Sequence, residues 1–280
     1  MSKIKKVTRI LRTRGLSGLI HAIDSRIWGL LAIRSKSYQA FKSFFRGKKG
    51  LEIGGPSKVF ARRNIFPVYP IVGQLDNCNY SSETVWEVNI ERGQVYHFDL
   101  KKPPGRQFIA EATALGSVPP GIYDFVLSSH MLEHSANPIL ALREWIRILK
   151  DQGMLVMLLP HKDGTFDHRR PVTTMEHLVA DFDAGMTEND LTHMPEILAL
   201  HDLDLDPEAG DSVAFKARSL RNSENRCFHH HVFDTSLAVS LVNHMGLQLR
   251  AVETIQPMHI LVVAQKLKDG DSMDNSAFVA

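Results

Sequence analysis

The sequence contains little of what stabilises small secreted or fibrous proteins. Among its 280 residues there are only two cysteines, Cys78 and Cys227, and we find no internal repeat or low-complexity tract. Two distant cysteines without CxxC spacing provide neither a disulfide framework nor a cysteine-ligated zinc site. With 44% hydrophobic residues, the composition excludes collagen-like, coiled-coil and wholly disordered chains. We therefore expect one large core domain with appendages, in a reducing cytoplasm.

Long apolar runs and a secretory leader are also missing from the N-terminal region. Its longest apolar run, residues 27–33, has seven residues, whereas about 20 are needed to span a bilayer. Arg9, Arg12 and Arg14 interrupt the stretch in which the apolar part of a signal peptide would stand. We therefore expect a cytoplasmic protein without a transmembrane helix.

Basic residues are concentrated at the N-terminus. Residues 1–50 contain 13 Lys and Arg against one acidic residue, Asp24, so the rest of the chain is net acidic. Apolar residues at three- and four-residue spacing predict helices over about 4–13 and 17–34. We interpret residues 1–46 as a basic helical extension that either packs on the body or lies against anionic lipid at the inner face of the membrane. A nucleic-acid partner is disfavoured, because the body has no aromatic-rich basic surface.

Residues 47–268 alternate between apolar strands and amphipathic helices. The predicted strands cover residues 50–54, 69–75, 107–110, 123–127, 154–159 and 258–266, and the clearest predicted helices cover 138–150 and 232–245. Strands without polar alternation, separated by helices or loops, predict a parallel sheet covered on both faces, and thus an α/β fold. A polar, irregular segment at about 161–231 is expected on the substrate side, and residues 269–280 are expected to form a flexible tail.

The turn after the first strand, residues 51–57 (LEIGGPS), is the first functional signal. An acidic residue followed by glycines leaves bare backbone at the carboxyl edge of a parallel sheet, where ligands of open α/β folds bind. A second acidic residue is expected about 20 residues later to bind ribose hydroxyls, and Asp76 lies 22 residues after Gly54. Alone, this pattern is compatible with nucleotide binding or with tight packing.

A second sequence motif, at residues 123–160, helps to decide between nucleotide binding and tight packing. It contains Asp124 in an apolar strand, the triplet Leu-Glu-His at 132–134, a helix ending in Arg147-Ile-Leu-Lys-Asp-Gln-Gly153, and a strongly apolar strand. This order resembles the class I S-adenosylmethionine-dependent methyltransferases of the methyltransferase-11 type, and the resemblance covers residues 50–160. It implies a Rossmann-like class I methyltransferase sheet with helices on both faces, and S-adenosyl-L-methionine as the cofactor.

The resemblance also assigns cofactor-binding roles by position. It implies that Glu52, Gly54 and Gly55 shape the methionine-binding turn, that Asp76 binds the ribose, that Glu111 and Ala112 face the adenine, and that Ser129 and His130 lie beside the sulfonium and ribose. Pro56 departs from the family pattern, because it stands at a glycine position and lacks an N–H donor. The long stretch at 79–105 is expected to be an insertion that covers the site or forms a substrate wall.

The segment directly after the fifth expected strand, residues 161–170 (HKDGTFDHRR), is rich in groups that can accept a proton. A hydroxyl acceptor must lose its proton during methyl transfer, which requires such a group within hydrogen-bond reach. We therefore predict His161, Asp163 and His168 as catalytic residues. The predicted reaction is methyl transfer to a small or medium acceptor at a hydroxyl, for example of a glycan or polar metabolite.

Three alternatives stay open at this point. The acceptor could be a lipid or quinone-type molecule at the membrane surface, or the chain could be a non-catalytic cofactor-binding regulatory module. The many histidines could also ligate a divalent metal that activates the hydroxyl. The candidate ligands are His161, Asp163, Asp167, His168, His193, His201 and Asp202. We favour no metal, with these histidines held by ordinary loop contacts, and expect at most two of the consecutive residues 229–231 (HHH) to serve one site.

Overall fold

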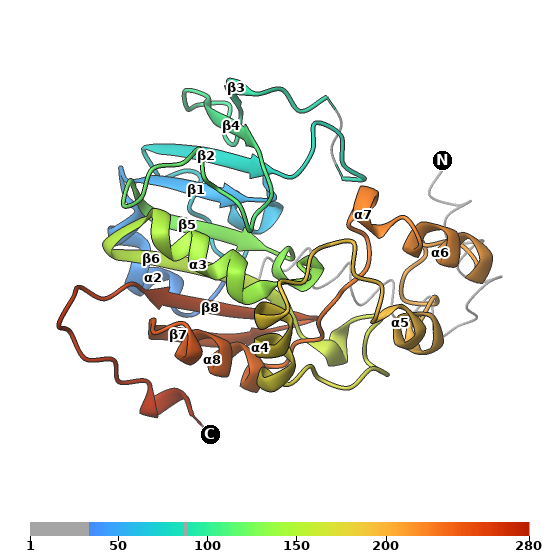
Figure 1. The fold of residues 1–280 in the computed structure, drawn as a ribbon. Coiled ribbons are helices and arrows are strands. Elements are labelled where there is room, and N and C mark those ends of the chain that lie inside the picture. The colour runs from blue at the N-terminus through green and yellow to red at the C-terminus, as the bar shows by residue number, and fades with distance from the viewer. Residues whose placement is uncertain (1–33, 87–88, 280) are drawn as a thin grey trace.

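The computed structural model describes residues 34–86 and 89–279, which form one eight-stranded sheet with helices on both faces (Figure 1). The strands are β1 (Lys49–Ile53), β2 (Gln74–Asn79), β3 (Gly93–Tyr96), β4 (Gly105–Ile109), β5 (Tyr123–Ser129), β6 (Leu149–Pro160), β7 (Gln248–Ile255) and β8 (His259–Gln265). Their order across the sheet is β3-β4-β2-β1-β5-β6-β8-β7. The five central strands, β4 to β6, are parallel, and β3, β8 and β7 add antiparallel edges.

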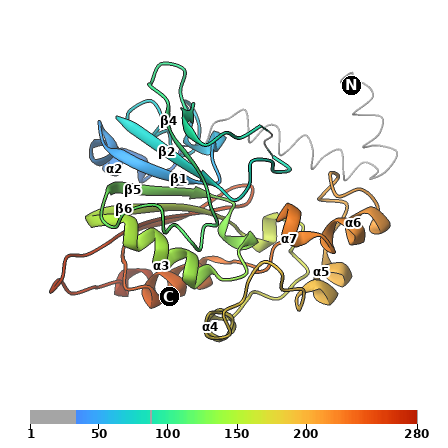
Figure 2. The same cartoon turned by 45° about the horizontal axis from the view of Figure 1, so that its top comes forward.

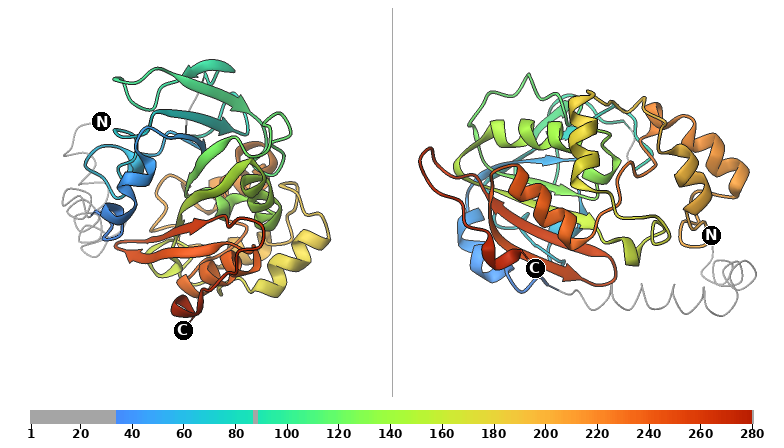
Figure 3. Two further views of the ribbon diagram at one scale, coloured as in Figure 1. Left: turned by 90° about the vertical axis from the view of Figure 1, so that its left-hand side faces the viewer. Right: turned by 60° about the horizontal axis from the view of Figure 1, so that its bottom comes forward.

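Two apolar layers enclose the sheet. Helices α3 (Pro138–Ile148) and α8 (Thr235–His244) cover one face, and α4 (Met175–Asp183) packs against both of them. Helix α2 (Tyr38–Phe45) lies on the opposite face, as Figure 3 shows. Trp145 and Leu241 are fully buried in the first layer, and Phe45 packs edge-on against Phe125 of β5 in the second, with ring centroids 5.2 Å apart. Because both faces are covered, residues 125–127 of β5 and 154–159 of β6 are apolar without alternation.

A small lobe of three short helices stands beyond the carboxyl ends of the parallel strands (Figures 1 and 2). It comprises α5 (Met194–Leu200), α6 (Ser212–Ser219) and α7 (Asn222–Asn225), and its own core includes Ile197, Phe215 and Phe228. Single-turn 3₁₀ helices span Lys58–Phe60, Leu132–His134, Lys162–Gly164 and Ser276–Phe278.

The predicted α/β class is confirmed, with several local differences. The second strand begins only at Gln74, because the apolar residues 69–73 form a turn whose side chains Tyr69 and Val72 enter the core. β7 was not predicted, since its burial follows no clean alternation. The segment at 161–231 is not irregular throughout but contains α4 to α7. The predicted helices at 4–13 and 17–34 lie, except for Arg34, outside the described residues.

The C-terminal segment, expected to be a flexible tail, is attached to the body. The Asn275 side chain is buried, accepts a hydrogen bond from the Leu249 backbone N–H at 2.7 Å and donates one to the Leu247 carbonyl at 2.9 Å. One amide thus satisfies backbone groups at the start of β7, which explains why this polar segment is held in place.

Across residues 34–86 and 89–279, none of the helices has both the length and the apolar character needed to cross a membrane.

Helix α8 provides a stability test of the fold. The Asp234 carboxylate accepts a hydrogen bond at 2.7 Å from the Leu237 N–H, which would otherwise be unpaired at the helix start. We expect Asp234→Ala to lower the free energy of unfolding by about 1 kcal/mol, the usual cost of losing such a cap. Urea denaturation measures this change. Asp269→Ala, at an exposed position, is the control, and equal stability of the two variants would contradict the capping role.

Candidate active site at the carboxyl edge of the sheet

A cavity of about 470 Å³ opens where β1, β2, β4 and β5 end. Its size falls within the usual range of about 300 to 1,000 Å³ for small-molecule sites. The lining consists of Ile53, Gly54, Gly55, Pro56, Cys78, Asn79, Tyr80, Thr84, Trp86, Ala110, Glu111, Ala112, Ser129, His130, Met131, His134, Ser135, Glu188 and Arg226. Six of the sequence-predicted cofactor residues therefore meet in one cavity, because the carboxyl ends of parallel strands share one edge.

The turn after β1 is built so that only glycine fits. Gly54 has a φ of +77°, and a Cβ on Gly55 would lie 2.4 Å from the carboxyl carbon of Glu52. Behind the turn, fully buried Glu52 accepts hydrogen bonds from the Ser57 N–H at 3.0 Å, the Tyr69 hydroxyl at 2.7 Å and the Tyr96 hydroxyl at 2.6 Å. Burial raises the pKa of Glu52, although these donors oppose the shift. Glu52 thus supports the turn from behind and does not line the cavity.

Asp76, predicted to bind the ribose, lies in the strand rather than at its end. Its carboxylate accepts hydrogen bonds from the Tyr123 hydroxyl at 2.7 Å and the Arg106 N–H at 2.8 Å, and it does not line the cavity. The sequence predicted a strand over residues 69–75, which put Asp76 at the strand end. In the structure β2 begins at Gln74, five residues later, and ends at Asn79. Asn79, the last residue of β2, stands at the cavity instead.

The predicted catalytic residues His161, Asp163 and His168 do not line the cavity either. The His161 N–H donates to the Met258 carbonyl at 2.7 Å, which turns the chain toward β8. The His161 ring lies 3.8 Å from the Asp163 carboxylate, and His168 contacts Asp202 at 2.9 Å. The base predicted from the position after β6 is therefore directed away from the cavity by the pairing of β6 with β8.

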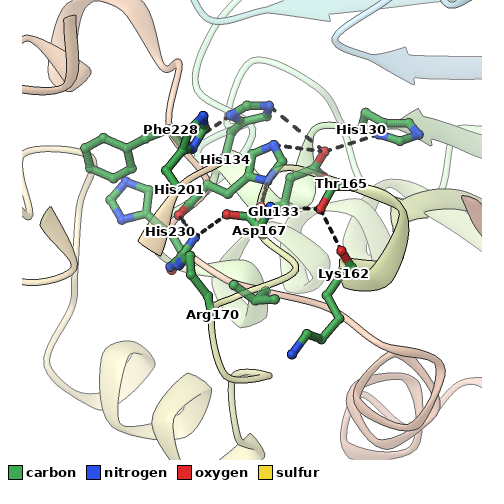
Figure 4. A network of polar contacts seen from close by, with 12 residues as sticks. His130, Glu133, His134, Lys162, Thr165, Asp167, Arg170, His201, Phe228 and His230 are labelled. Atoms are coloured by element: carbon green, nitrogen blue, oxygen red, sulfur yellow. Dashed lines mark hydrogen bonds and ion pairs between the residues drawn. The ribbon is translucent and has the colours of Figure 1, made fainter. Parts of the chain in front are cut away.

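A buried carboxylate surrounded by histidines lies next to the cavity instead (Figure 4). The Glu133 side chain is fully buried, and within the described residues neither of its oxygens has a hydrogen-bond partner. Its Oε1 lies 3.6 Å from Nδ1 of His130 and 4.0 Å from Nε2 of both His134 and His229. Burial raises the pKa of Glu133 to about 7. Two of these histidines, His130 and His134, line the cavity.

The histidine rings are oriented by their other nitrogen atoms. His134 Nδ1 lies 3.1 Å from the Phe228 carbonyl, so it donates there and leaves Nε2 as an acceptor. Burial, with a smaller effect of His229, holds the pKa of His134 well below its ordinary value, so this ring is neutral. His130 has a φ of +50°, a conformation rare for a residue with a side chain and typical of functional sites.

His229 is held by a buried ion pair. Its Nδ1 contacts Asp167, which also accepts a hydrogen bond from Arg170 at 2.9 Å. Although burial alone would lower it, the charge of Asp167 raises the pKa of His229. Arg170 is itself 1% exposed and donates to the carbonyls of His229 and His230. The only sequence signals for this group were the HHH run and the polar segment at 161–170.

The insertion expected at 79–105 forms part of the cavity wall. Tyr80, Thr84 and Trp86 line the cavity, and the Trp86 ring lies 5.4 Å from that of His134. At the other side, Arg226 pairs with Glu111 at 2.7 Å and stacks over the Tyr80 ring at 5.1 Å. Sequence reasoning missed Arg226, which follows α7 far along the chain.

Comparisons with known proteins agree with this architecture. Residues 31–203, more than half of the chain, match the family described as a methyltransferase domain. Among solved structures, the chain is similar to a SAM-dependent methyltransferase from Aquifex aeolicus, at 14% identity and a TM-score of 0.45, covering 83% of this chain and 90% of that one.

It is also similar to a putative S-adenosylmethionine-dependent methyltransferase from Listeria monocytogenes, at 16% identity and a TM-score of 0.46, covering 83% of this chain and 97% of that one. An S-adenosylmethionine-dependent methyltransferase from Mesorhizobium loti gives 13% identity, a TM-score of 0.47, and coverage of 82% and 97%. No curated protein sequence matches the chain. Because the family match covers more than half of the chain, the chain belongs to the methyltransferase domain family and is an S-adenosylmethionine-dependent methyltransferase.

Proposed function

We propose that the protein transfers the methyl group of S-adenosylmethionine to a hydroxyl of a small or medium polar acceptor, of the sugar or glycan type. The observation that carries this proposal is the neutral His134 at the cavity, whose Nε2 is free to accept a proton and lies 4.0 Å from buried Glu133. A hydroxyl acceptor must lose its proton during methyl transfer and therefore needs such a base. A thiolate or a stabilised carbanion is already deprotonated and does not need one at this step.

The cavity residues fit the cofactor in this proposal. The bare backbone of Gly54 and Gly55 accommodates its methionine part, and Asn79 takes the place of Asp76 at the ribose hydroxyls. Glu111 and Ala112 face the adenine, and Ser129 and His130 lie beside the sulfonium. These assignments follow the order in which β1, β2, β4 and β5 end along the cavity.

The residues of this chain then have three tasks. When bound, the cofactor supplies a methyl group already activated by a positively charged sulfur, so the protein mainly aligns the acceptor and excludes water. His134 removes the acceptor hydroxyl proton at its Nε2, and the forming imidazolium is stabilised by the carboxylate of Glu133. The carbonyl of Phe228 keeps the His134 ring in the required tautomer.

The cavity mouth supports an acceptor that is polar but has a flat apolar face. Trp86 is 63% exposed, although it lines the cavity and lies beside His134. Such a ring provides an apolar surface with a hydrogen-bonding edge. Glu188 also lines the cavity, where its carboxylate can meet polar groups of the acceptor.

Gly54→Arg tests the cofactor site. We expect it to abolish binding of S-adenosylhomocysteine, because a side chain at this φ of +77° enters the turn that holds the ligand. Calorimetric titration measures the loss. Gly121→Arg is the matched control, since Gly121 also has a positive φ, +63°, and open space around it. Retained affinity in Gly54→Arg would show that the ligand binds elsewhere.

Asn79→Ala tests the revised ribose contact. Losing one or two hydrogen bonds should weaken S-adenosylhomocysteine binding by roughly tenfold, or about 1.4 kcal/mol. Asp76→Asn should instead lower thermal stability and leave the affinity of the folded protein nearly unchanged. Calorimetry and thermal unfolding on both variants separate these effects. The opposite result, affinity lost only in Asp76→Asn, would restore the prediction made from the sequence.

His134→Ala tests the base. With sugars and sugar nucleotides as acceptors, and quinones and lipids as the alternative panel, turnover is followed as release of S-adenosylhomocysteine. We expect kcat to fall by about 10² to 10⁴, with cofactor affinity nearly unchanged. His97→Ala, at an exposed position, is the control. If His161→Ala lost activity while His134→Ala kept it, the base would lie in the segment at 161–170.

A further inference from the structure

A second group of titratable side chains lies on the far side of the HHH segment, away from the cavity lining. His177 and Asp181 come from α4, His193 directly precedes α5, and His231 ends the HHH run. One ligand atom from each of these four residues lies within 4.8 Å of the others. The His231 side chain is fully buried, Asp181 is 6% exposed, and His177, at 45%, opens the group to solvent.

Three of the distances within this group are close to those of a tetrahedral metal site. Metal–ligand bonds of about 2.0 to 2.1 Å place neighbouring ligand atoms about 3.3 Å apart in a tetrahedron. Nε2 of His177 lies 2.8 Å from Nε2 of His193 and 3.2 Å from Oδ2 of Asp181, and Nε2 of His231 lies 3.7 Å from the same oxygen. The (i, i+4) spacing of His177 and Asp181 puts both on one face of α4.

A supporting hydrogen bond orients His193. Its Nδ1 lies 3.2 Å from Oδ2 of Asp190, whose carboxylate is in turn fixed by the N–H and hydroxyl of Thr192 at 3.0 and 2.8 Å. When His193 donates its Nδ1 proton to Asp190, its Nε2 presents a lone pair to the centre of the group. This carboxylate–histidine pair is the usual support of a metal-ligating imidazole.

The buried carboxylate lacks a conventional partner. Among the described residues, no hydrogen bond reaches Oδ2 of Asp181, although this atom is buried and faces the imidazoles of His177 and His231, with His193 in the same group. A buried acceptor without a donor costs free energy, whereas a cation at the centre of the group would satisfy it together with the imidazole lone pairs. For His231, Nε2 would then bind the ion in place of its long contact with the Ala136 carbonyl, 3.4 Å away.

We propose that His177, Asp181, His193 and His231 bind one zinc ion. Three imidazoles and one carboxylate are ligands typical of zinc, and four protein ligands make a closed, structural site rather than a catalytic one. The ion joins α4, the start of the α5–α7 lobe, and the HHH segment. It thereby fixes the chain on which His229 lies beside the active site.

The test measures metal content, which needs neither acceptor nor turnover. The full-length protein is equilibrated with zinc, desalted and analysed by elemental analysis and native mass spectrometry. We expect one zinc per wild-type chain. Replacing zinc by cobalt should give the visible absorption of tetrahedral Co²⁺. Zinc affinity should fall at least tenfold in Asp181→Asn and His177→Ala, and remain unchanged in His97→Ala.

Thermal unfolding provides a second readout, because an ion that binds only the folded state raises the melting temperature. Chelation should lower the melting temperature of the wild type and leave that of His177→Ala, altered at an exposed side chain, unchanged. Wild-type protein that retains no zinc, or Asp181→Asn that binds it as tightly, overturns the proposal. A third outcome also overturns it: His134→Ala loses zinc while Asp181→Asn retains it. That result would place the ion at Glu133, His134 and His229.

Discussion

The buried carboxylate of Glu52 forms the interaction on which the cavity edge of the sheet depends. Its oxygens accept hydrogen bonds from three parts of the chain: the turn at Ser57, the core residue Tyr69, and Tyr96 of the edge strand β3. A buried carboxylate without donors would be strongly destabilising. The tight turn, the core beneath it and the added edge strand are therefore held in one arrangement, and the bare backbone of Gly54 and Gly55 faces the cavity as a consequence.

Much of this edge could be predicted from the sequence, because local patterns encode it. The glycines after β1, and Glu111, Ala112, Ser129 and His130 near the ends of β4 and β5, lie at or just after strand ends, and all six line the cavity. The prediction was wrong for Asp76, where the apolar side chains of residues 69–73 belong to a turn packed into the core. Hydrophobicity alone does not distinguish such a turn from a strand.

The histidine side of the cavity could not be predicted in the same way, because it depends on contacts between distant segments. His134 is oriented by the carbonyl of Phe228, 94 residues away, and His229 by Asp167, 62 residues away. Likewise, β8 directs His161 away from the cavity only because it pairs antiparallel with β6. The sequence therefore showed a cluster of proton acceptors at residues 161–170, but the pairing of β6 with β8 keeps His161 from the cavity, which His130 and His134 line instead.

The three consecutive histidines 229–231 contact two different groups of residues. Their side chains point in different directions, as the sequence suggested: His229 contacts Asp167, His230 lies against Asn222, and His231 faces Asp181. Buried Arg170 donates to the carbonyls of His229 and His230 and so fixes the backbone between them. An interaction that holds His231 against Asp181 of α4 therefore also restrains His229, two residues earlier, whose ring lies beside Glu133. In this arrangement, the position of His229 beside Glu133 depends on packing on the opposite side of the same segment.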